Sequence, residues 1–342
     1  MTLPTFADVR DAAARIAPYA LVTPVLRSDR IDALVGAAVV FKCENLQRGG
    51  AFKFRGATNA VWSLGDEDAA RGVVTHSSGN HGNALAMAAR TRGITAHVVV
   101  PEGAVKTKVD AIVAAGATVH RCAPTTAARE AKAAELMAST GATLVHPYAD
   151  PRVMAGQGTL VPELLRQAPG IDTILFPVGG GGLASGCSIA AHGIDPAIVL
   201  FGAEPEGADD AARSLEADER VGPFTAHTIC DGLRTLIGEP NFHVLREQAV
   251  TVLRVSDVEV VSAMRLLWSE LRIVVEPSSA TVLAALLRYP ERVNGRRVGA
   301  VLTGGNVDLD DLPWEAFARR APPEADIRGT FAWLFSSHLQ DV

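Results

Sequence analysis

The stretch that decides the fold is Val178-Gly179-Gly180-Gly181-Gly182-Leu183, which lies between an apolar run and an Ala-rich segment. Four consecutive glycines permit left-handed backbone and let a ligand approach the main chain closely. Successive inward-pointing N–H groups form a nest for an anion, and a helix that begins there adds its dipole. No Gly-Lys-Ser/Thr follows, and the pattern is not GxGxxG with a distant acidic residue. The stretch therefore predicts a phosphate site between a strand and a helix.

Short β-branched runs alternate with Ala-rich segments on both sides of this loop. Strands and helices that alternate at this spacing predict βαβ units and a mostly parallel sheet, and hence an α/β fold. The expected helical segments are 83–93, 104–116, with Gly116 as its C-terminal glycine, 127–140 and 183–193. The expected strands are 39–43, 73–76, 96–100, 118–122, 143–146, 173–178, 198–203 and 298–302.

Composition narrows the class of protein. The chain has 342 residues, of which 48% are hydrophobic and 20% charged, with a net charge of −6. These values fit a globular protein with a large core and disfavour a disordered chain. The acidic balance argues against nucleic-acid binding. No apolar run is long enough for a transmembrane helix, and the N-terminal residues do not resemble a secretory signal. We expect a cytoplasmic protein without nucleic-acid or membrane partners.

The four cysteines, Cys43, Cys122, Cys187 and Cys230, are far apart in the sequence. Their spacing matches neither a disulfide framework nor a zinc site, and the nine histidines include no HExxH. Free thiols in a reducing compartment are expected.

A second candidate segment is Gly-Gly-Ala-Phe-Lys-Phe-Arg-Gly at residues 49–56. Its lysine, Lys53, stands between two phenylalanines where a loop is expected to become a helix. An apolar surround lowers the pKa of a lysine, and such a lysine can form a Schiff base with a carbonyl compound. Taken alone, a lysine with a solvated ammonium group is the commoner case.

Two further segments follow expected strands. Ser77-Ser78-Gly79-Asn80-His81-Gly82 precedes the helix expected over 83–92, so its hydroxyls and N–H groups suit a carboxylate or phosphate, or simply cap the helix. Leu302-Thr303-Gly304-Gly305-Asn306 lies at the carboxyl end of a late strand, where ligands bind in open α/β sheets. Thr303 offers a hydroxyl there, although a lone threonine is more often a turn residue.

These four segments in this order resemble the fold-type II pyridoxal-phosphate enzymes, and in particular the serine racemase and serine/threonine dehydratase family. The likeness runs from about Thr5 to about Leu309 and includes HPYADPRVMAGQGT, GAEPEGADD, ICDGLRTLIG and VVEPSSA. It implies two open, mostly parallel sheets flanked by helices. The implied domains are a large cofactor domain of residues 1–71 and 150–320, a small mobile domain of residues 72–149, and a C-terminal tail of residues 321–342.

The resemblance implies pyridoxal phosphate as the cofactor, with Lys53 as its Schiff-base lysine. A hydroxyl rather than an aspartate at the pyridine nitrogen would make the ring a weaker electron sink, which suits β-elimination better than transamination. The other implied contacts are Phe52 and Gly232 on the two sides of the ring, Asn80 at the phenolic oxygen, Thr303 at the nitrogen, and Gly179, Gly180, Gly181, Gly182 and Leu183 at the phosphate.

The resemblance also assigns substrate and metal residues. Ser78 matches the serine of racemases and would be a second base. Glu204 and Asp210, with the Ala208 carbonyl, match a site for Mg²⁺ or Ca²⁺, whose preferred ligands are oxygens. The substrate residues implied are Ser77, Asn80 and His81 at the carboxylate, and Arg129 and Thr235 in the closed form.

The resulting hypothesis is a homodimeric dehydratase that converts a β-hydroxy amino acid such as L-serine or L-threonine to a 2-oxo acid and ammonia. Lys53 would remove the α-proton as general base, and serine racemisation would be a second activity. Three alternatives remain open. Arg129 with Arg234 would favour 3-hydroxyaspartate. Tyr148, which stands where serine racemase has a smaller polar residue, would favour phenylserine. A β-replacement enzyme of the cysteine-synthase type is less favoured.

Overall fold

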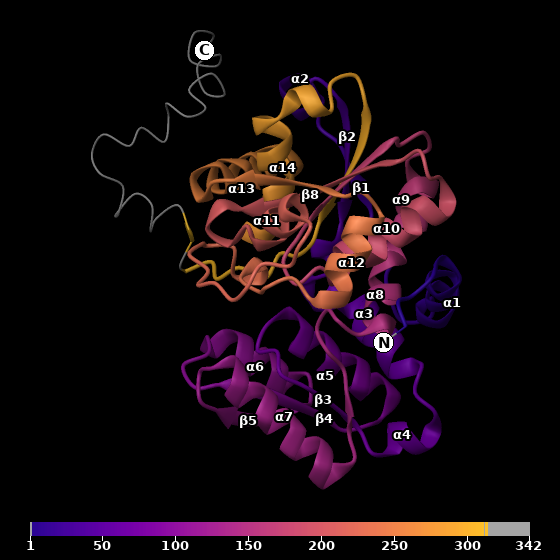
Figure 1. Cartoon of the computed structure of the whole chain (residues 1–342), viewed down its shortest axis with the longest axis vertical. Coiled ribbons are helices and arrows are strands. Elements are labelled where there is room, and N and C mark those ends of the chain that lie inside the picture. The colour runs from indigo at the N-terminus through magenta and orange to yellow at the C-terminus, as the bar shows by residue number, and fades with distance from the viewer. Residues whose placement is uncertain (1, 311, 314–342) are drawn as a thin grey trace, which may run out of the picture.

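The computed structural model describes residues 2–310, 312 and 313, which form two lobes, each built on its own sheet (Figure 1). The tail predicted at 321–342 lies outside the described residues. The larger lobe has six strands in the order β1-β2-β10-β7-β8-β9, and only β1 runs antiparallel to its neighbour. These strands are β1 (Val25–Leu26), β2 (Ala38–Cys43), β7 (Thr173–Pro177), β8 (Val199–Pro205), β9 (Thr251–Val255) and β10 (Arg297–Leu302).

Helices cover both faces of the larger sheet, which explains why its central strands are buried along almost their whole length. One face carries α2 (Asp29–Val35), α13 (Asp257–Leu271) and α14 (Pro277–Arg288). The other carries α1 (Phe6–Ile16), α8 (Pro151–Gly158), α9 (Leu160–Gln167), α10 (Gly182–Ile194), α11 (Asp210–Ala217) and α12 (Glu239–Glu247).

The smaller lobe has a four-stranded parallel sheet in the order β5-β4-β3-β6. Side chains alternate between its faces, as in any strand: Val98 and Val100 belong to the cluster of α6, whereas Val99 packs with α7. Its elements are β3 (Val73–Thr75), β4 (Ala96–Pro101), β5 (Thr118–Cys122), β6 (Thr143–Leu144), α4 (Asp66–Ala70), α5 (Asn80–Arg92), α6 (Lys106–Ala114) and α7 (Thr126–Thr140).

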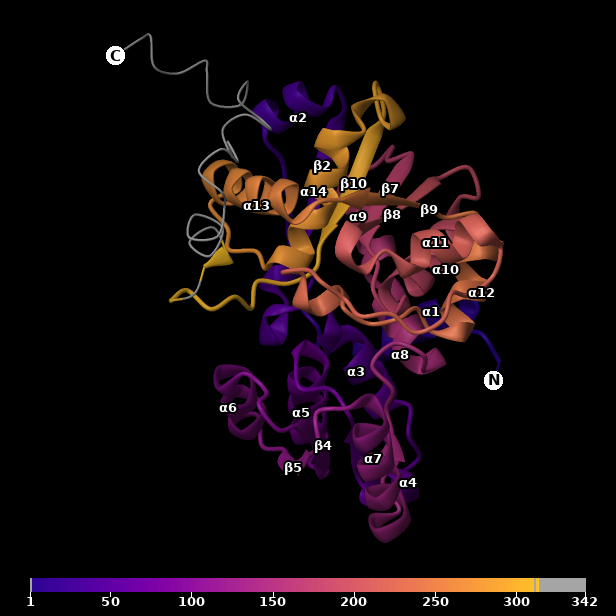
Figure 2. The same ribbon diagram turned by 60° about the vertical axis from the view of Figure 1, so that its left-hand side comes forward.

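Helix α3 (Lys53–Trp62) and α8 lie at the junction of the two lobes in both views (Figure 1 and Figure 2). The two helices touch closely, because an added Cβ at Gly56 would lie 2.7 Å from the Val153 carbonyl oxygen. The first residue of α3 is Lys53, so the candidate lysine stands where the lobes meet.

The α/β class and the two mostly parallel sheets are confirmed, and all eight predicted strands are present. The short β1 and the edge strand β9 were not predicted; in β9 an exposed Thr251 and a half-buried Arg254 interrupt the apolar pattern. Gly116 follows α6 with a left-handed φ of +98°, as expected. Helix α5 begins at Asn80 rather than at 83, because Gly79 is its N-cap. No helix among the described residues is both long and apolar enough to cross a membrane.

Candidate active site

The carboxyl ends of strands from both sheets carry the candidate segments. Thr303 follows β10, the glycine loop follows β7, and Ser77 follows β3. The segment before Lys53 is joined to the segment after β10 by main-chain hydrogen bonds: Phe52 N–H donates to the Thr303 carbonyl (3.0 Å), and Gly305 N–H donates to the Gly50 carbonyl (2.9 Å).

Lys53 is largely withdrawn from solvent. Its Nζ donates to the Pro147 carbonyl oxygen (2.9 Å) and lies 5.0 Å from the centre of the Phe52 ring. Burial lowers the pKa of Lys53 to about 8, while the charge of Glu276 acts in the opposite direction. A pKa of about 8 makes the neutral amine, the form that acts as nucleophile or proton acceptor, far more accessible near neutral pH than in an ordinary lysine.

The glycine loop between β7 and α10 has no room for side chains. A Cβ at Gly180 would lie 2.5 Å from the Tyr148 ring, and one at Gly182 would lie 2.8 Å from Tyr148 Cα. Gly181 is the N-cap of α10 with a left-handed φ of 89°, and no side chain caps this helix. The first N–H groups of α10 are therefore not capped by a side chain, and the loop fits the phosphate of a cofactor such as pyridoxal phosphate.

The segment before α5 forms a second cluster of main-chain donors. A Cβ at Gly82 would lie 2.0 Å from the Ser77 carbonyl oxygen, so only glycine lets this loop fold back on the helix. Gly79 is the N-cap and makes no side-chain cap bond. Ser78, which is half-buried, is thus not the cap of α5, which removes the simplest structural explanation of that serine.

Asn80 and His81 form the first turn of α5. The Asn80 Nδ2 donates to both carboxylate oxygens of Glu276 (3.0 and 3.1 Å), and its Oδ1 accepts from Asn306 (2.9 Å). His81 Nε2 lies 3.2 Å from the Val145 carbonyl, while its Nδ1 is buried without a partner. Burial, helped by the charge of Lys53, holds the pKa of His81 well below its usual value, so the ring is neutral.

Other predicted residues lie further from Lys53 or are engaged elsewhere. Gly232 N–H donates to Ser278 Oγ (3.0 Å), and a Cβ at Gly232 would lie 3.9 Å from Glu276 Oε1. Arg234 donates twice to the Thr228 carbonyl (2.9 and 2.6 Å), so its guanidinium is directed to the main chain. Thr235 is half-buried between that segment and α12.

Arg129 lies on α7 of the smaller lobe. Its Nη2 donates to Thr126 Oγ1 (3.1 Å), and its charge adds to burial in lowering the pKa of His76. The His76 ring meets the His146 ring edge to face, and His146 meets Tyr148 in the same way. The charge of Arg129 thus acts on His76, which belongs to a group of rings that continues through His146 to Tyr148, next to Pro147.

The three predicted metal ligands lie in the last part of β8, in the turn after it and at the start of α11. Glu204 is the second-to-last residue of β8 and accepts from the N–H groups of Ala211 (3.3 Å) and Ala212 (2.9 Å). Asp210 accepts from Ile237 N–H through Oδ2 (2.7 Å), whereas its Oδ1 is buried and unpaired. Burial raises the pKa of Asp210 to about 6 and that of Glu204 well above its usual value.

Both acids are fully buried, so they are not ordinary solvated surface carboxylates. Ala208, in the turn Glu206–Ala208, is buried beside them. Within the described part of the chain, no three His, Cys, Asp or Glu side chains converge on one point. Two carboxylates, one of them with an unpaired oxygen, and a carbonyl still fit a cation that keeps several waters.

Sequence reasoning missed two residues of this region. Glu276 stands in the run VVEPSSA, where an acid inside an apolar stretch was the available signal. Asn241 donates to the Tyr148 carbonyl (3.1 Å) and to Ser185 Oγ (3.0 Å), and so fixes the segment that follows Pro147 against α10. No local pattern marks Asn241, because both of its partners are distant in sequence.

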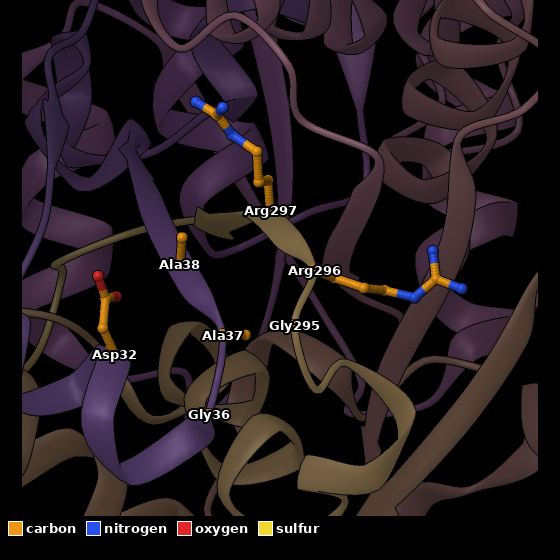
Figure 3. Close-up of a pocket in the computed structure, with 7 residues that line it drawn as sticks. All are labelled: Asp32, Gly36, Ala37, Ala38, Gly295, Arg296 and Arg297. Atoms are coloured by element: carbon orange, nitrogen blue, oxygen red, sulfur yellow. The ribbon is translucent and has the colours of Figure 1, made fainter.

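A pocket of about 360 Å³ lies at the opposite ends of β2 and β10. It is lined by residues 36–38 and 295–297 together with Asp32. The side chains of Arg296 and Arg297 point in different directions (Figure 3), so no charged groups converge there. We therefore assign the candidate site to the junction of the lobes.

Two mostly parallel sheets, a glycine loop suited to an anion and a lysine of lowered pKa fit an enzyme with a phosphate-bearing cofactor. The chain belongs to the family of pyridoxal-phosphate dependent enzymes, whose model matches residues 16–304. The fold is that of the fold-type II members.

Individual relatives cover almost the whole chain. A beta-hydroxyaspartate dehydratase of Paracoccus denitrificans (strain Pd 1222) is 46% identical over 92% of this chain and 100% of the relative. A serine racemase of Dictyostelium discoideum is 45% identical over 91% of this chain and 98% of the relative. The structure of maize serine racemase superposes with a TM-score of 0.88 at 42% identity, covering 93% of this chain and 98% of that one.

Proposed function

We propose that the protein is a pyridoxal-phosphate-dependent dehydratase, or ammonia-lyase, that acts on β-hydroxy amino acids such as L-serine and L-threonine, with serine racemisation as a second activity. The observation that carries the proposal is the place of Lys53. Its amine has a lowered pKa, lies at the junction of two lobes, and shares this junction with an uncapped glycine loop. The relatives named above are dehydratases and racemases, which supports the same class.

Each part of the site has a task in this proposal. Pyridoxal phosphate, when bound, draws electron density away from the α-carbon of the amino acid. The N–H groups of residues 179–183 would bind its phosphate, with Phe52 and Gly232 beside the ring, Asn80 at its phenolic oxygen and Thr303 at its nitrogen. Lys53 Nζ would first hold the cofactor and then take the α-proton. Its pKa of about 8 lets it accept and return that proton near neutral pH.

The substrate carboxylate would bind at the start of α5, through Ser77, Asn80 and His81. The first turn of this helix has free N–H groups and a positive dipole end, both of which favour an anion. Arg129 and Thr235 would approach the substrate when a small domain, residues 72–149, closes against the large one. Closure would exclude water while the β-hydroxyl leaves.

A second candidate substrate is 3-hydroxyaspartate, and one observation favours it. The positive charge of Arg129 acts on both His76 and Tyr148, so a cation is available near these rings for a second carboxylate. Arg234, by contrast, is directed to the Thr228 carbonyl, so a pair of arginines is not supported. For phenylserine the support is weaker, because the Tyr148 ring already packs on Gly180.

Three further assignments complete the proposal. Mg²⁺ or Ca²⁺ would bind at Glu204, Asp210 and the Ala208 carbonyl, supported by the buried, partly unpaired carboxylates. A cytoplasmic location is supported by four free cysteines, three of them buried. A homodimer is supported by exposed apolar side chains at Leu21, Val22, Leu46 and Val274.

The test is a panel of both stereoisomers of serine, threonine, 3-hydroxyaspartate and phenylserine, assayed for ammonia and for the 2-oxo acid. We expect at least one β-hydroxy amino acid to give equal amounts of the two products. Arg129→Met should raise KM for 3-hydroxyaspartate far more than for serine if that arginine binds a second carboxylate. A holoenzyme that releases ammonia from none of these compounds would contradict the proposal.

A further inference from the structure

Glu276 is a buried carboxylate that does not serve its own helix. It is the N-cap residue of α14, yet its side chain makes no cap hydrogen bond, and it is only 4% exposed. A buried carboxylate is costly unless hydrogen bonds compensate it, and an acid at this position would ordinarily stabilise the helix end. The side chain is instead directed into the junction of the lobes.

The partners of Glu276 fix one side chain of the site. Both of its oxygens accept from Asn80 Nδ2, at 3.0 and 3.1 Å. On the other side of the same amide, Asn80 Oδ1 accepts from Asn306 Nδ2 at 2.9 Å. An amide with an acceptor at its nitrogen and a donor at its oxygen has only one favourable orientation. Glu276 and Asn306 therefore determine which atom of Asn80 faces the cleft.

The same contact connects the two lobes. Asn80 opens α5 of the smaller lobe, whereas Glu276 precedes α14 of the larger one, 196 residues away in sequence. Glycines make room for the carboxylate: a Cβ at Gly304 would lie 2.6 Å from Glu276 Oε1. Glu276 thus sits between the segment after β10 and Gly232, two segments assigned to the cofactor in the proposed function.

We propose that Glu276, in its ionised form, is a positioning residue that orients the Asn80 amide toward the cofactor and holds the two lobes together around Lys53. The inference rests on the proposed function in one respect, the assignment of Asn80 to the cofactor. It adds a residue to which neither the family resemblance nor the sequence patterns gave a role.

The charges around Glu276 make its contact with Asn80 sensitive to pH. Burial first, and then the charge of Asp231, raise the pKa of Glu276 to about 7, while the Asn80 hydrogen bond and Lys108 lower it. The charged groups that face it are Lys53 on α3, Lys108 on α6 and Asp231 in the turn Asp231–Leu233. Lys108 and Asp231 form an ion pair with each other.

The direction of the pH effect on Asn80 depends on which protonation state of Glu276 accepts its hydrogen bonds. Below pH 7 the carboxyl is protonated and loses acceptor strength toward the Asn80 amide. Above pH 7 the carboxylate accepts fully. The orientation of Asn80 should therefore be best defined on the alkaline side of a transition centred near pH 7.

The experiment titrates the absorption spectrum of the bound cofactor with pH in the absence of substrate, so it does not depend on turnover. In the wild type we expect a spectral transition near pH 7, and in Glu276→Gln its loss. The dissociation constant of pyridoxal phosphate should rise roughly tenfold or more, as expected when a hydrogen bond to a charged group is lost. Glu247→Gln removes the same charge from an exposed site and should change neither quantity.

Two further variants move the transition without touching Glu276. Asp231→Asn should shift it to lower pH, because a negative neighbour is removed, and Lys108→Met should shift it to higher pH. If Glu276→Gln fails to fold by circular dichroism, these two shifts still test the proposal. The proposal would be overturned if the spectral transition survived in folded Glu276→Gln. It would also be overturned if neither Asp231→Asn nor Lys108→Met changed the pH of the transition. Because the readout is the cofactor spectrum, failure of the dehydratase assay would be a separate result.

Discussion

Burial shifts the pKa values of Lys53, His81 and Glu276 in the direction that favours the neutral form of each side chain. The two phenylalanines beside Lys53 suggested its lowered pKa, although from the residues alone a solvated lysine was the commoner case and the family resemblance was needed to single it out. The sequence could not predict the task of Glu276, whose partner Asn80 is 196 residues away. A short motif shows only the neighbours of a residue along the chain, whereas the residues that contact it across the fold are known only from the structure.

Ser78 allows a sharp prediction at this scale. A planar carbanion can be protonated from either face, and Lys53 serves only one of them. If Ser78 serves the other, Ser78→Ala should abolish racemisation of serine and action on the D-isomer while retaining much of the L-serine dehydration. The measurement is the ratio of racemisation to dehydration in the wild type and the variant.

The alternative for Ser78 is a contact to the substrate carboxylate. In that case Ser78→Ala would weaken both reactions together, by about 0.5–1.5 kcal/mol for one hydrogen bond. Ser63→Ala, on the surface after α3, is the matched control. An unchanged ratio would rule out the two-base mechanism.

At the scale of the elements, α3 is anchored by charge as well as by packing. Arg55, two residues after Lys53, is fully buried and pairs with Glu44 (2.8 Å) and Glu163 (2.8 Å). Lys42 on β2 also pairs with Glu163 (2.9 Å), so two cations and two anions share one buried cluster. This cluster holds the start of α3, and hence Lys53, against β2 and α9.

Removal of the Arg55 side chain should therefore destabilise the protein strongly. Arg55→Met leaves Glu44 buried without its cation, which costs about 3–5 kcal/mol when one partner of a buried pair is lost. The free energy of unfolding from urea titration is the measurement, with Arg292→Met, an exposed arginine, as the control. A loss below about 1 kcal/mol, the usual value of a surface pair, would contradict the role of the cluster.

The turn between β8 and α11 gives a prediction on cations and pH. Asp210 and Glu204 have raised pKa values, so their folded forms favour protonation. Without a cation, stability should fall as the pH rises from about 4, where these acids ionise in the unfolded chain, through about 6 for Asp210.

A bound cation should offset the loss of stability caused by ionising Glu204 and Asp210. We expect Mg²⁺ or Ca²⁺ to raise the Tm more at pH 7.5 than at pH 5, and chelator to lower it. Asp210→Asn should make the Tm insensitive to both additions, whereas Asp308→Asn, an exposed acid, should not. Equal Tm values with chelator and with cation at pH 7.5 would contradict a cation site at Glu204 and Asp210.

Most elements could be predicted from local pattern, and the exceptions have physical reasons. Six of the eight predicted strands are mostly buried, and β5 and β6 are less so, whereas β1 has two residues and β9 is an edge strand with an exposed Thr251. Helix α5 begins three residues before the expected 83, because Asn80 and His81 belong to its first turn. That shift matters, because it moves both residues from a loop onto a rigid helix.

At the scale of the whole molecule, the two lobes meet over the site and leave apolar surface elsewhere. Leu21 and Leu46 are 43% and 46% exposed, and both adjoin Gln47, which bonds the Leu21 main chain. Val274 is 42% exposed, and its carbonyl accepts from Asn45. These side chains form one patch of the larger lobe.

The patch should be the contact between two copies if the protein is a homodimer. Leu46→Lys should then shift the mass measured by light scattering toward that of one chain, while Val113→Lys, at a somewhat more exposed position on α6, should not. A wild-type mass of one chain at micromolar concentration would contradict the dimer.

The central claim is that Lys53 carries the cofactor. The most direct measurement is borohydride reduction of the holoenzyme, followed by peptide mapping of the pyridoxyl label by mass spectrometry. The account predicts one labelled lysine, Lys53, and in Lys53→Ala no covalent label, no turnover and an unchanged circular dichroism spectrum. A label on another lysine, or normal turnover by Lys53→Ala, would contradict it.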